Sequence, residues 1–255
     1  MCFLKKKFFK IISKVLNLLG YRLIKKEKFF LLNIEKFKKK TSDFSAENFI
    51  NFITENKSLS KSQIFQDLFV DFILRGKLNG FYCEVGAANG IDLSNTFYLE
   101  KKRKWKGILC EPSHHWKNQL SSNRHNNILI FDALSSKNET ITFYENENNF
   151  LSGLKKNLNY SKSYDVKTTT LNSVFSNFQI KELDYLSIDT EGNELAVLDG
   201  LDLKKYRPKV ITIEHNYVNE NLIFKRLSKH NYKLIFPYLS RFDSFYVCKK
   251  FLEKN

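Results

Sequence analysis

The sequence lacks an uninterrupted apolar segment long enough to cross a membrane. A membrane-spanning helix needs about 18 consecutive apolar residues, whereas the apolar stretch from Ile11 to Leu19 is interrupted by Lys14. No cleavage site with small residues follows this stretch, which argues against a secretory signal. We therefore expect a protein of the cytoplasm, located at the inner face of the membrane if its N-terminal segment binds lipid.

Cysteine is scarce, and its spacing excludes several kinds of site. The chain has four cysteines, and no two of them form a CxxC pair or another metal-ligand spacing. Cys83, Cys110 and Cys248 lie in apolar runs, where a free cysteine behaves as a small apolar side chain. This pattern fits a reducing compartment. Internal repeats are also absent from the sequence, which excludes a repeat architecture.

Positive charge is abundant but concentrated at the N-terminus. The formal net charge is +15, yet residues 1–40 alone contain thirteen lysine or arginine residues and two glutamates. The remainder is nearly balanced, with 29 basic and 25 acidic residues. Nucleic-acid binding usually requires a basic patch on the folded domain, so we expect no nucleic-acid partner.

The N-terminal segment has the pattern of an amphipathic helix over residues 4–19. Apolar residues share one broad face at helical spacing, and lysines occupy the opposite face. Such a helix can bind a membrane surface peripherally or pack on the protein's own core, and the pattern does not separate the two. We predict a basic, amphipathic helical extension over residues 1–60 and a main domain over residues 61–255.

The main domain alternates short apolar runs with helical patterns. This alternation predicts an α/β fold with a doubly wound, mostly parallel sheet. Polar residues with little periodicity predict a long, mobile loop over residues 145–170, and residues 139–144 suggest an extra strand. The predicted strands are Phe81–Val85, Trp105–Glu111, Ile128–Phe131, Asp184–Ile188, Val210–Glu214, Lys233–Phe236 and Ser244–Val247. The predicted helices cover residues 60–75, 93–102, 113–121, 192–199 and 219–229.

The turn after the first predicted strand has the character of a nucleotide-binding turn. Small residues between Gly86 and Gly90 let a ligand approach the backbone closely. The turn lacks the GxGxxG pattern that seats a pyrophosphate, and Glu84 would repel one. An acid favours S-adenosylmethionine, which carries an ammonium and a sulfonium group. Glu111 ends the second strand, where an acid typically binds ribose hydroxyls.

Several blocks of sequence, in order, resemble the FkbM-type methyltransferases from about Ser62 to Val247. The matching blocks are Gln63–Asp67, Tyr82–Gly90, Ser94–Thr96, Trp105–Pro112, Asp132–Leu134 and Asp184–Glu194. The resemblance implies a class I methyltransferase (Rossmann-like) fold, S-adenosylmethionine as cofactor, and O-methylation, often of sugars or natural products. Members often occur among genes for surface polysaccharides, which suggests a role in polysaccharide biosynthesis.

The resemblance also implies which residues bind the cofactor. Glu111 would hold the ribose, and Asp132 with Ala133 would approach the adenine. The first-strand acid is usually aspartate in this family, so Glu84 departs from the pattern. The residues that would line the methionine part are Glu84, Gly86, Ala87, Asn89 and Gly90.

An acidic cluster follows the fourth predicted strand. Asp189 and Glu191 would position an acceptor hydroxyl or accept its proton, and His215 after the fifth strand is a further candidate base. The alternative is that the acids only stabilise a helix N-terminus. Asp189, Glu214 and Asn216 also have oxygen ligands for a divalent cation, but we assign no metal ligand from the sequence.

We therefore expect an S-adenosylmethionine-dependent O-methyltransferase that acts on a sugar hydroxyl of a glycan or glycolipid, with a carbohydrate or lipid-linked glycan as its partner. Two alternatives stay open. The first is an NAD-dependent Rossmann dehydrogenase, which the missing GxGxxG disfavours. The second is a membrane-tethered module that binds the cofactor without catalysis.

Overall fold

The computed structural model describes residues 44–156, 160–240 and 242–253. The chain divides into two compact units, residues 1–42 and 43–255, and the description below concerns the second. The amphipathic helix predicted for residues 4–19 lies outside the described residues. Its binding to a membrane or to the protein itself therefore stays a prediction.

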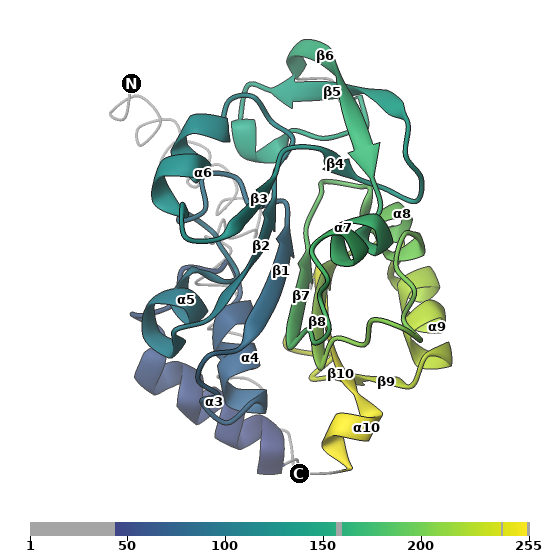
Figure 1. Ribbon diagram of the computed structural model, residues 1–255. Helices are drawn as coiled ribbons and strands as arrows, with labels where there is room; N and C mark the ends of the chain where they lie inside the picture. The colour runs from purple at the N-terminus through teal and green to yellow at the C-terminus, as the bar shows by residue number, and fades with distance from the viewer. Residues whose placement is uncertain (1–43, 157–159, 241, 254–255) are drawn as a thin grey trace, which may run out of the picture. The chain divides into compact units, whose positions relative to one another are not determined.

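A seven-stranded sheet forms the centre of the described unit (Figure 1). Its strand order is β3-β2-β1-β7-β8-β10-β9, and only β10 runs antiparallel to its neighbours. The predicted strands are all present, displaced by at most one residue at either end. Their bounds are β1 Phe81–Val85, β2 Lys106–Cys110, β3 Ile128–Ile130, β7 Tyr185–Ile188, β8 Val210–Glu214, β9 Tyr232–Ile235 and β10 Asp243–Cys248.

Helices cover both faces of this sheet, which confirms the doubly wound α/β prediction. In Figure 1, α4, α5 and α6 lie on one side of the sheet and α7, α8 and α9 on the other. Among the described residues, no helix is both long and apolar enough to cross a membrane. The helices are α3 Phe44–Asn56, α4 Gln66–Ile73, α5 Phe97–Arg103, α6 Lys117–Asn123, α7 Leu171–Asn177, α8 Glu194–Asp199, α9 Glu220–Lys229 and α10 Lys249–Leu252.

Helix α5 begins four residues later than predicted, at Phe97 rather than at residue 93. The reason is a competing set of hydrogen bonds. The Ser94 hydroxyl, the Asn95 N–H and the Thr96 hydroxyl all donate to the buried carboxylate of Glu84. Side chains that bond in this way hold the backbone out of a helix, so the helix starts only after Thr96.

The segment between β3 and β7 includes further strands, so the prediction of a loop over residues 145–170 is wrong for residues 145–146 and 160–169. It contains a second sheet in the order β4-β6-β5, formed by β4 (Ala133–Leu134), β5 (Thr140–Asn146) and β6 (Tyr160–Thr169). The extra strand predicted at residues 139–144 corresponds to β5. We call the antiparallel pair of β5 and β6 the β5–β6 ribbon.

Helix α3 packs within the second unit through aromatic contacts. The ring of Phe49 stacks on Phe236 with centroids 5.1 Å apart and meets the edge of Phe69 in α4 at 5.6 Å. The division between compact units lies at residues 42 and 43, whereas the sequence-based boundary is at residues 60 and 61. Residues 44–56 therefore pack with the main domain.

The parallel strands bring their carboxyl ends to one edge of the sheet, which we call the carboxyl edge. Because β10 is antiparallel, it begins at this edge, with Asp243 paired to Glu214 of β8. A doubly wound sheet binds its ligands at this edge. The candidate residues that come directly after strands here, or that end one, are Gly86, Glu111, Asp189 and Glu214, and Asp132 lies between β3 and β4.

Candidate active site

The turn after β1 is packed tightly between the ends of two neighbouring strands. The N–H groups of Gly86 and Ala87 donate to the carbonyl oxygen of Cys110 in β2 over 2.9 and 3.1 Å. Gly86 has a φ of +89°, and a Cβ atom here would lie 1.7 Å from the carbonyl oxygen of Asp189. Only glycine fits this position, so the ends of β1 and β7 are in direct backbone contact.

The second half of the turn is closed by a side chain. The amide oxygen of Asn89 accepts hydrogen bonds from the N–H groups of Ile91 and Asp92, each over 2.9 Å. Gly90 has a φ of +78°, and a Cβ atom there would lie 2.6 Å from Cγ of Arg124. Asn89 and Gly90 therefore shape the turn, and their predicted contact with a cofactor stays a prediction.

The buried side chain of Arg124 holds the glycine turn in place, and the sequence analysis did not identify this role. Its side chain is 1% exposed. The guanidinium donates to the carboxylate of Glu100, the carbonyl oxygen of Gly90 and the hydroxyl of Tyr82, each over 2.6 Å. In the sequence Arg124 is one basic residue among many after a helical pattern, so no signal distinguishes it.

The carboxylate of Glu84 accepts hydrogen bonds from within the protein. It is buried, and its donors are the residues that precede α5, as described above. Burial raises the pKa of Glu84, and the nearby charge of Arg124 opposes that rise. The structure therefore gives Glu84 a positioning role at the start of α5. The contact predicted between its side chain and the cofactor remains untested.

Glu111 lies at the end of β2 with its carboxylate facing the glycine turn. One oxygen accepts the N–H of Ala88 over 2.9 Å, and the other accepts the N–H of Ser113 over 2.8 Å. Burial is the main cause that raises the pKa of Glu111 from 4.5 to about 7. A carboxylate oxygen has more than one lone pair, so Glu111 can still accept hydrogen bonds from ligand hydroxyls.

A polar hollow of about 220 Å³ lies beside Glu111. Asp132 lines it, as do the β2–α6 turn and residues 165–167 of β6. Ala133 is buried in a small core with Phe143 and Val166, and its predicted approach to the adenine stays a prediction. The lining residues are Pro112, Ser113, His114, Lys117, Phe131, Asp132, Asp165, Val166 and Lys167.

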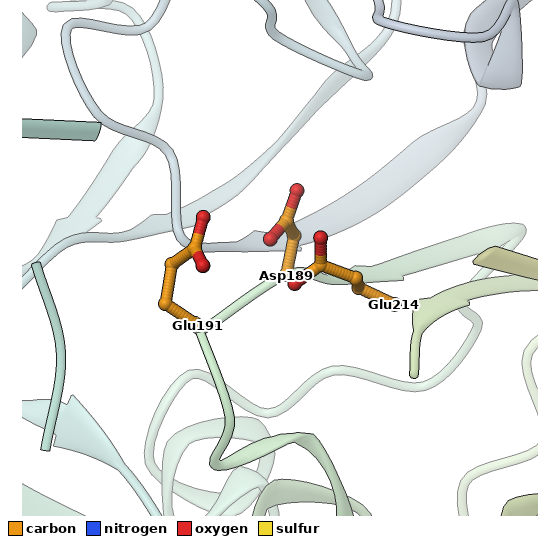
Figure 2. Close-up of side chains that lie close together, drawn as sticks. All are labelled: Asp189, Glu191 and Glu214. Atoms are coloured by element: carbon orange, nitrogen blue, oxygen red, sulfur yellow. The ribbon is translucent and has the colours of Figure 1, made fainter. Parts of the chain in front are cut away.

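Three carboxylates meet at the ends of β7 and β8. Figure 2 shows the side chains of Asp189, Glu191 and Glu214 gathered at the carboxyl edge. One carboxylate oxygen of each lies within 4.8 Å of those of the other two. Asp189 and Glu191 are half-buried and Glu214 is buried. The sequence analysis grouped Asp189 with Glu191 as catalytic candidates and Asp189 with Glu214 and Asn216 as possible oxygen ligands, and the structure brings Asp189, Glu191 and Glu214 together.

Glu214 lies in an environment that strongly disfavours its ionised form. Burial and the charges of Asp189 and Glu191 raise the pKa of Glu214 from 4.5 to about 10. Glu214 is 5% exposed, and its Oε2 atom has no hydrogen-bond partner among the described residues. A buried oxygen of this kind requires a proton or a cation.

His215 follows Glu214, but its ring is engaged with the backbone. The N–H of Tyr217 donates to its Nδ1 atom over 3.0 Å, which places the ring proton of the neutral form on Nε2. Burial lowers the pKa of His215 below 6.5. A neutral ring protonated at Nε2 is a hydrogen-bond donor on that side, which weakens the prediction that His215 is the base.

The turn after η1 (Asn149–Leu151) packs against the acidic cluster. A Cβ atom on Gly153 would lie 3.2 Å from the carbonyl oxygen of Thr190 and 3.5 Å from Cβ of Glu191. Lys155 reaches Gly192, where its Nζ atom would lie 3.4 Å from an added Cβ. Glu194 closes the other side, since one of its oxygens accepts the N–H of Gly192 over 2.7 Å. Residues 153–155 therefore form one wall of the cluster.

Comparison with known proteins identifies a family. The model of the FkbM methyltransferase domain family matches residues 84–236, more than half of the chain. This range includes the glycine turn, Glu111, the ribbon and the acidic cluster. None of the curated proteins compared with the chain matches it.

Solved structures of methyltransferases resemble the chain at low identity. Methyltransferase FkbM from Methylobacillus flagellatus KT has 13% identity and a TM-score of 0.45, over 80% of this chain and 62% of that protein. Precorrin-6y C5,15-methyltransferase from Geobacter metallireducens GS-15 has 11% identity and a TM-score of 0.44, over 75% and 89%. A putative caffeoyl-CoA O-methyltransferase from Staphylococcus aureus has 11% identity and a TM-score of 0.44, over 85% and 99%. The chain thus spans less than two thirds of the length of the first of these.

Proposed function

Since the chain belongs to the FkbM methyltransferase family, we propose that it methylates a hydroxyl oxygen of a carbohydrate within a glycan or glycolipid. Membership of the family makes the chain a methyltransferase, and S-adenosylmethionine is its methyl donor. The proposal concerns the acceptor, and it places the enzyme in polysaccharide biosynthesis in the cytoplasm.

The residues at the carboxyl edge fit this cofactor, which supplies an electrophilic methyl group on a sulfonium. The glycine turn brings the backbone ends of β1 and β7 into contact at Gly86, and the methionine part would lie against the backbone of this turn. Glu111 keeps acceptor capacity for the ribose hydroxyls, and the hollow beside Asp132 takes the adenine. An NAD-dependent dehydrogenase fits less well, because the turn offers no GxGxxG for a pyrophosphate.

The observation that carries O-methylation is the position of Asp189. Its carbonyl oxygen touches the glycine turn at Gly86, and its carboxylate belongs to the acidic cluster. A hydroxyl oxygen is a poor nucleophile until a base accepts its proton. Asp189 extends from a buried strand of the sheet, so it holds that base beside the methionine part of the cofactor.

A carbohydrate suits the surface beside the cluster. Tyr217 is 62% exposed and Tyr238 is 72% exposed, and both lie in turns at the carboxyl edge, after β8 and β9. Exposed aromatic rings can stack on the apolar faces of sugar rings, and Lys155, which reaches Gly192 beside the cluster, adds a polar group. The combination favours an extended polar acceptor over a small apolar one.

Methyl transfer into a carbohydrate fraction tests this proposal. We expect the full chain to transfer tritium from labelled S-adenosylmethionine to a glycan or glycolipid extract, and acid hydrolysis to release the label as O-methyl sugars. Asp189→Asn should bind S-adenosylhomocysteine normally while turnover falls by about 10²–10⁴-fold, and His215→Ala should cost less. Label confined to nucleic acid or protein would contradict the carbohydrate acceptor. Near-normal turnover in Asp189→Asn with a large loss in His215→Ala would transfer the base role to His215.

A further inference from the structure

The acidic cluster has the composition and the dimensions of a cation site. Carboxylate oxygens are the ligands that hard divalent cations prefer. Two ligands on opposite sides of Mg²⁺ lie about 4.1 Å apart, and on Ca²⁺ about 4.6–5.2 Å apart. One oxygen from each of Asp189, Glu191 and Glu214 lies within 4.8 Å of the others. All three can therefore reach one ion with little movement of the side chains.

Glu214 provides an independent sign of a missing ligand. Figure 2 shows its carboxyl group turned toward Asp189, into the cluster. The residue is 5% exposed, and Oε2 has no hydrogen-bond partner within the described part of the chain. An acidic cluster on a protein surface is common, but a buried carboxylate oxygen that no donor satisfies is costly. A cation bound among the three carboxylates would satisfy it.

We propose that Asp189, Glu191 and Glu214 bind one divalent cation of the hard class, such as Mg²⁺ or Mn²⁺. The site is built from the rigid ends of β7 and β8 and from the turn between β7 and α8. Asp189 and Glu191 follow β7, and Glu214 ends β8, which pairs with β7 in parallel register. The sequence alone assigned no metal ligand.

The cation would serve the acceptor, and this role rests on the proposed function. A hydroxyl bound to a divalent cation loses its proton more readily, because the cation stabilises the oxyanion. A carboxylate has two oxygens, so Asp189 can hold the cation with one and accept the hydroxyl proton with the other. The oxygen then attacks the methyl carbon as the carbon–sulfur bond breaks, and the electron pair stays on sulfur.

A competing source of positive charge is the ammonium group of the cofactor. The cluster adjoins the glycine turn, where the methionine part binds, so that ammonium could neutralise one carboxylate. The two sources differ in a measurable way. An ammonium held in the cluster would compete with a cation, whereas an ammonium held at the turn would leave cation binding unchanged.

Direct binding of Mn²⁺ to the full chain tests the proposal. The signal of free Mn²⁺ in electron paramagnetic resonance counts bound ions, with and without saturating S-adenosylhomocysteine. We expect one Mn²⁺ per chain, bound in both conditions. Glu214→Gln and Asp189→Asn should each weaken binding by at least about tenfold, as expected for a lost charged ligand. Glu220→Gln is the matched control, since it removes an exposed acid at the same edge outside the cluster, and it should bind Mn²⁺ normally.

Three results would overturn the cation site. They are no Mn²⁺ binding at millimolar concentration, unchanged binding in both cluster variants, and loss of Mn²⁺ when S-adenosylhomocysteine is added. Thermal unfolding of each variant shows whether it is folded. Glu214 and Asp189 belong to the ends of different strands, so if one variant fails to fold, the other still tests the site. Calorimetry of S-adenosylhomocysteine in a chelator separates the two proposals. Cofactor binding without Mn²⁺ binding would contradict only the cation site. Mn²⁺ binding without cofactor binding would contradict only the methyltransferase function.

Discussion

The pKa of Glu111 lies within the physiological range, so its charge responds to pH. In the proposed site the ionised form would accept hydrogen bonds from ribose hydroxyls, and the pKa of about 7 means that the free protein loses this form as the pH falls. We expect the affinity for S-adenosylhomocysteine to fall about tenfold between about pH 8 and about pH 6. Calorimetry at several pH values measures this change.

The variant Glu111→Gln is the control for that prediction. Glutamine keeps the shape but cannot ionise, so its affinity should be lower and nearly constant over the same range. Folding stability gives a second readout. The folded pKa of Glu111 is raised, so its contribution to the unfolding free energy is fully present below about pH 4.5 and is lost as the pH rises through about 7. A wild-type affinity that does not change with pH would show that Glu111 is not the ribose acid.

Arg124 supports the glycine turn, and its removal should destabilise the whole domain. Arg124→Met leaves the carboxylate of Glu100 and the hydroxyl of Tyr82 without their buried donor. Breaking a buried pair costs about 3–5 kcal/mol, and we expect the unfolding free energy in urea to fall by that amount. Arg226→Met is the matched control, because Arg226 pairs with Asp199 on the exposed surface. It should change stability by less than about 1 kcal/mol, and equal losses in the two variants would contradict the prediction.

At the scale of elements, the β5–β6 ribbon is fixed to the β2–α6 turn by Tyr164. Its hydroxyl donates to Glu145 over 2.5 Å and accepts the N–H of His114 over 2.9 Å. Its ring stacks on the ring of His114 with centroids 4.0 Å apart. His114 lines the polar hollow, so the ribbon and the proposed adenine site are connected through one side chain.

Tyr164→Phe should therefore weaken cofactor binding although Tyr164 lies on the ribbon. We expect a loss of about 1–2 kcal/mol in the binding of S-adenosylhomocysteine, the scale of a lost hydrogen bond that leaves its partners unsatisfied. Faster proteolysis within residues 147–160 should accompany it. Tyr144→Phe on the same ribbon is the control and should bind normally, because no described residue bonds to the Tyr144 hydroxyl. Normal binding in Tyr164→Phe would separate the ribbon from the cofactor site.

Elements whose side chains follow a simple pattern could be predicted from the sequence. The strands of the large sheet are short and apolar because they are buried on both faces, and the glycine turn and the Asp189 turn follow directly from where those strands end. The order of the strands does not follow from this alternation, because doubly wound sheets occur in more than one order and β10 lies antiparallel between β8 and β9.

Of the two strands of the ribbon, β5 matches the extra strand predicted at residues 139–144, but β6 could not be predicted, because its side chains do not alternate clearly. Strand β6 is exposed along most of its length, so polar residues such as Lys162 and Asp165 hide its period. The role of Glu84 depends on hydrogen bonds from residues 94–96, and the burial of Glu214 depends on the antiparallel strand β10 beside it. The hydrogen bonds of Glu84 and the burial of Glu214 depend on the tertiary structure, so residue type and spacing do not predict them.

At the scale of the whole molecule, residues 1–40 carry most of the net charge. We expect the full chain to co-sediment with vesicles of anionic phospholipid, and less so at high salt, because salt screens the attraction. The chain divides at residues 42 and 43, so a variant that lacks residues 1–42 should stay folded and remain in the supernatant. Unfolding of that variant in circular dichroism would instead show that the segment is part of the domain's core.

The central position of β1 affects how the chain can fold while it is being made. Strand β1 pairs with β2 about 25 residues later but with β7 about 100 residues later, as in the pair Tyr82 and Tyr185. At about 5–20 residues per second, a ribosome needs roughly 5–20 s to supply β7 after β1 has emerged. During that interval one edge of β1 has no strand to pair with, and an open edge invites pairing with other chains. The half of the sheet that is proposed to bind the cofactor is thus synthesised first, but it can close only when β7, which precedes Asp189, leaves the ribosome.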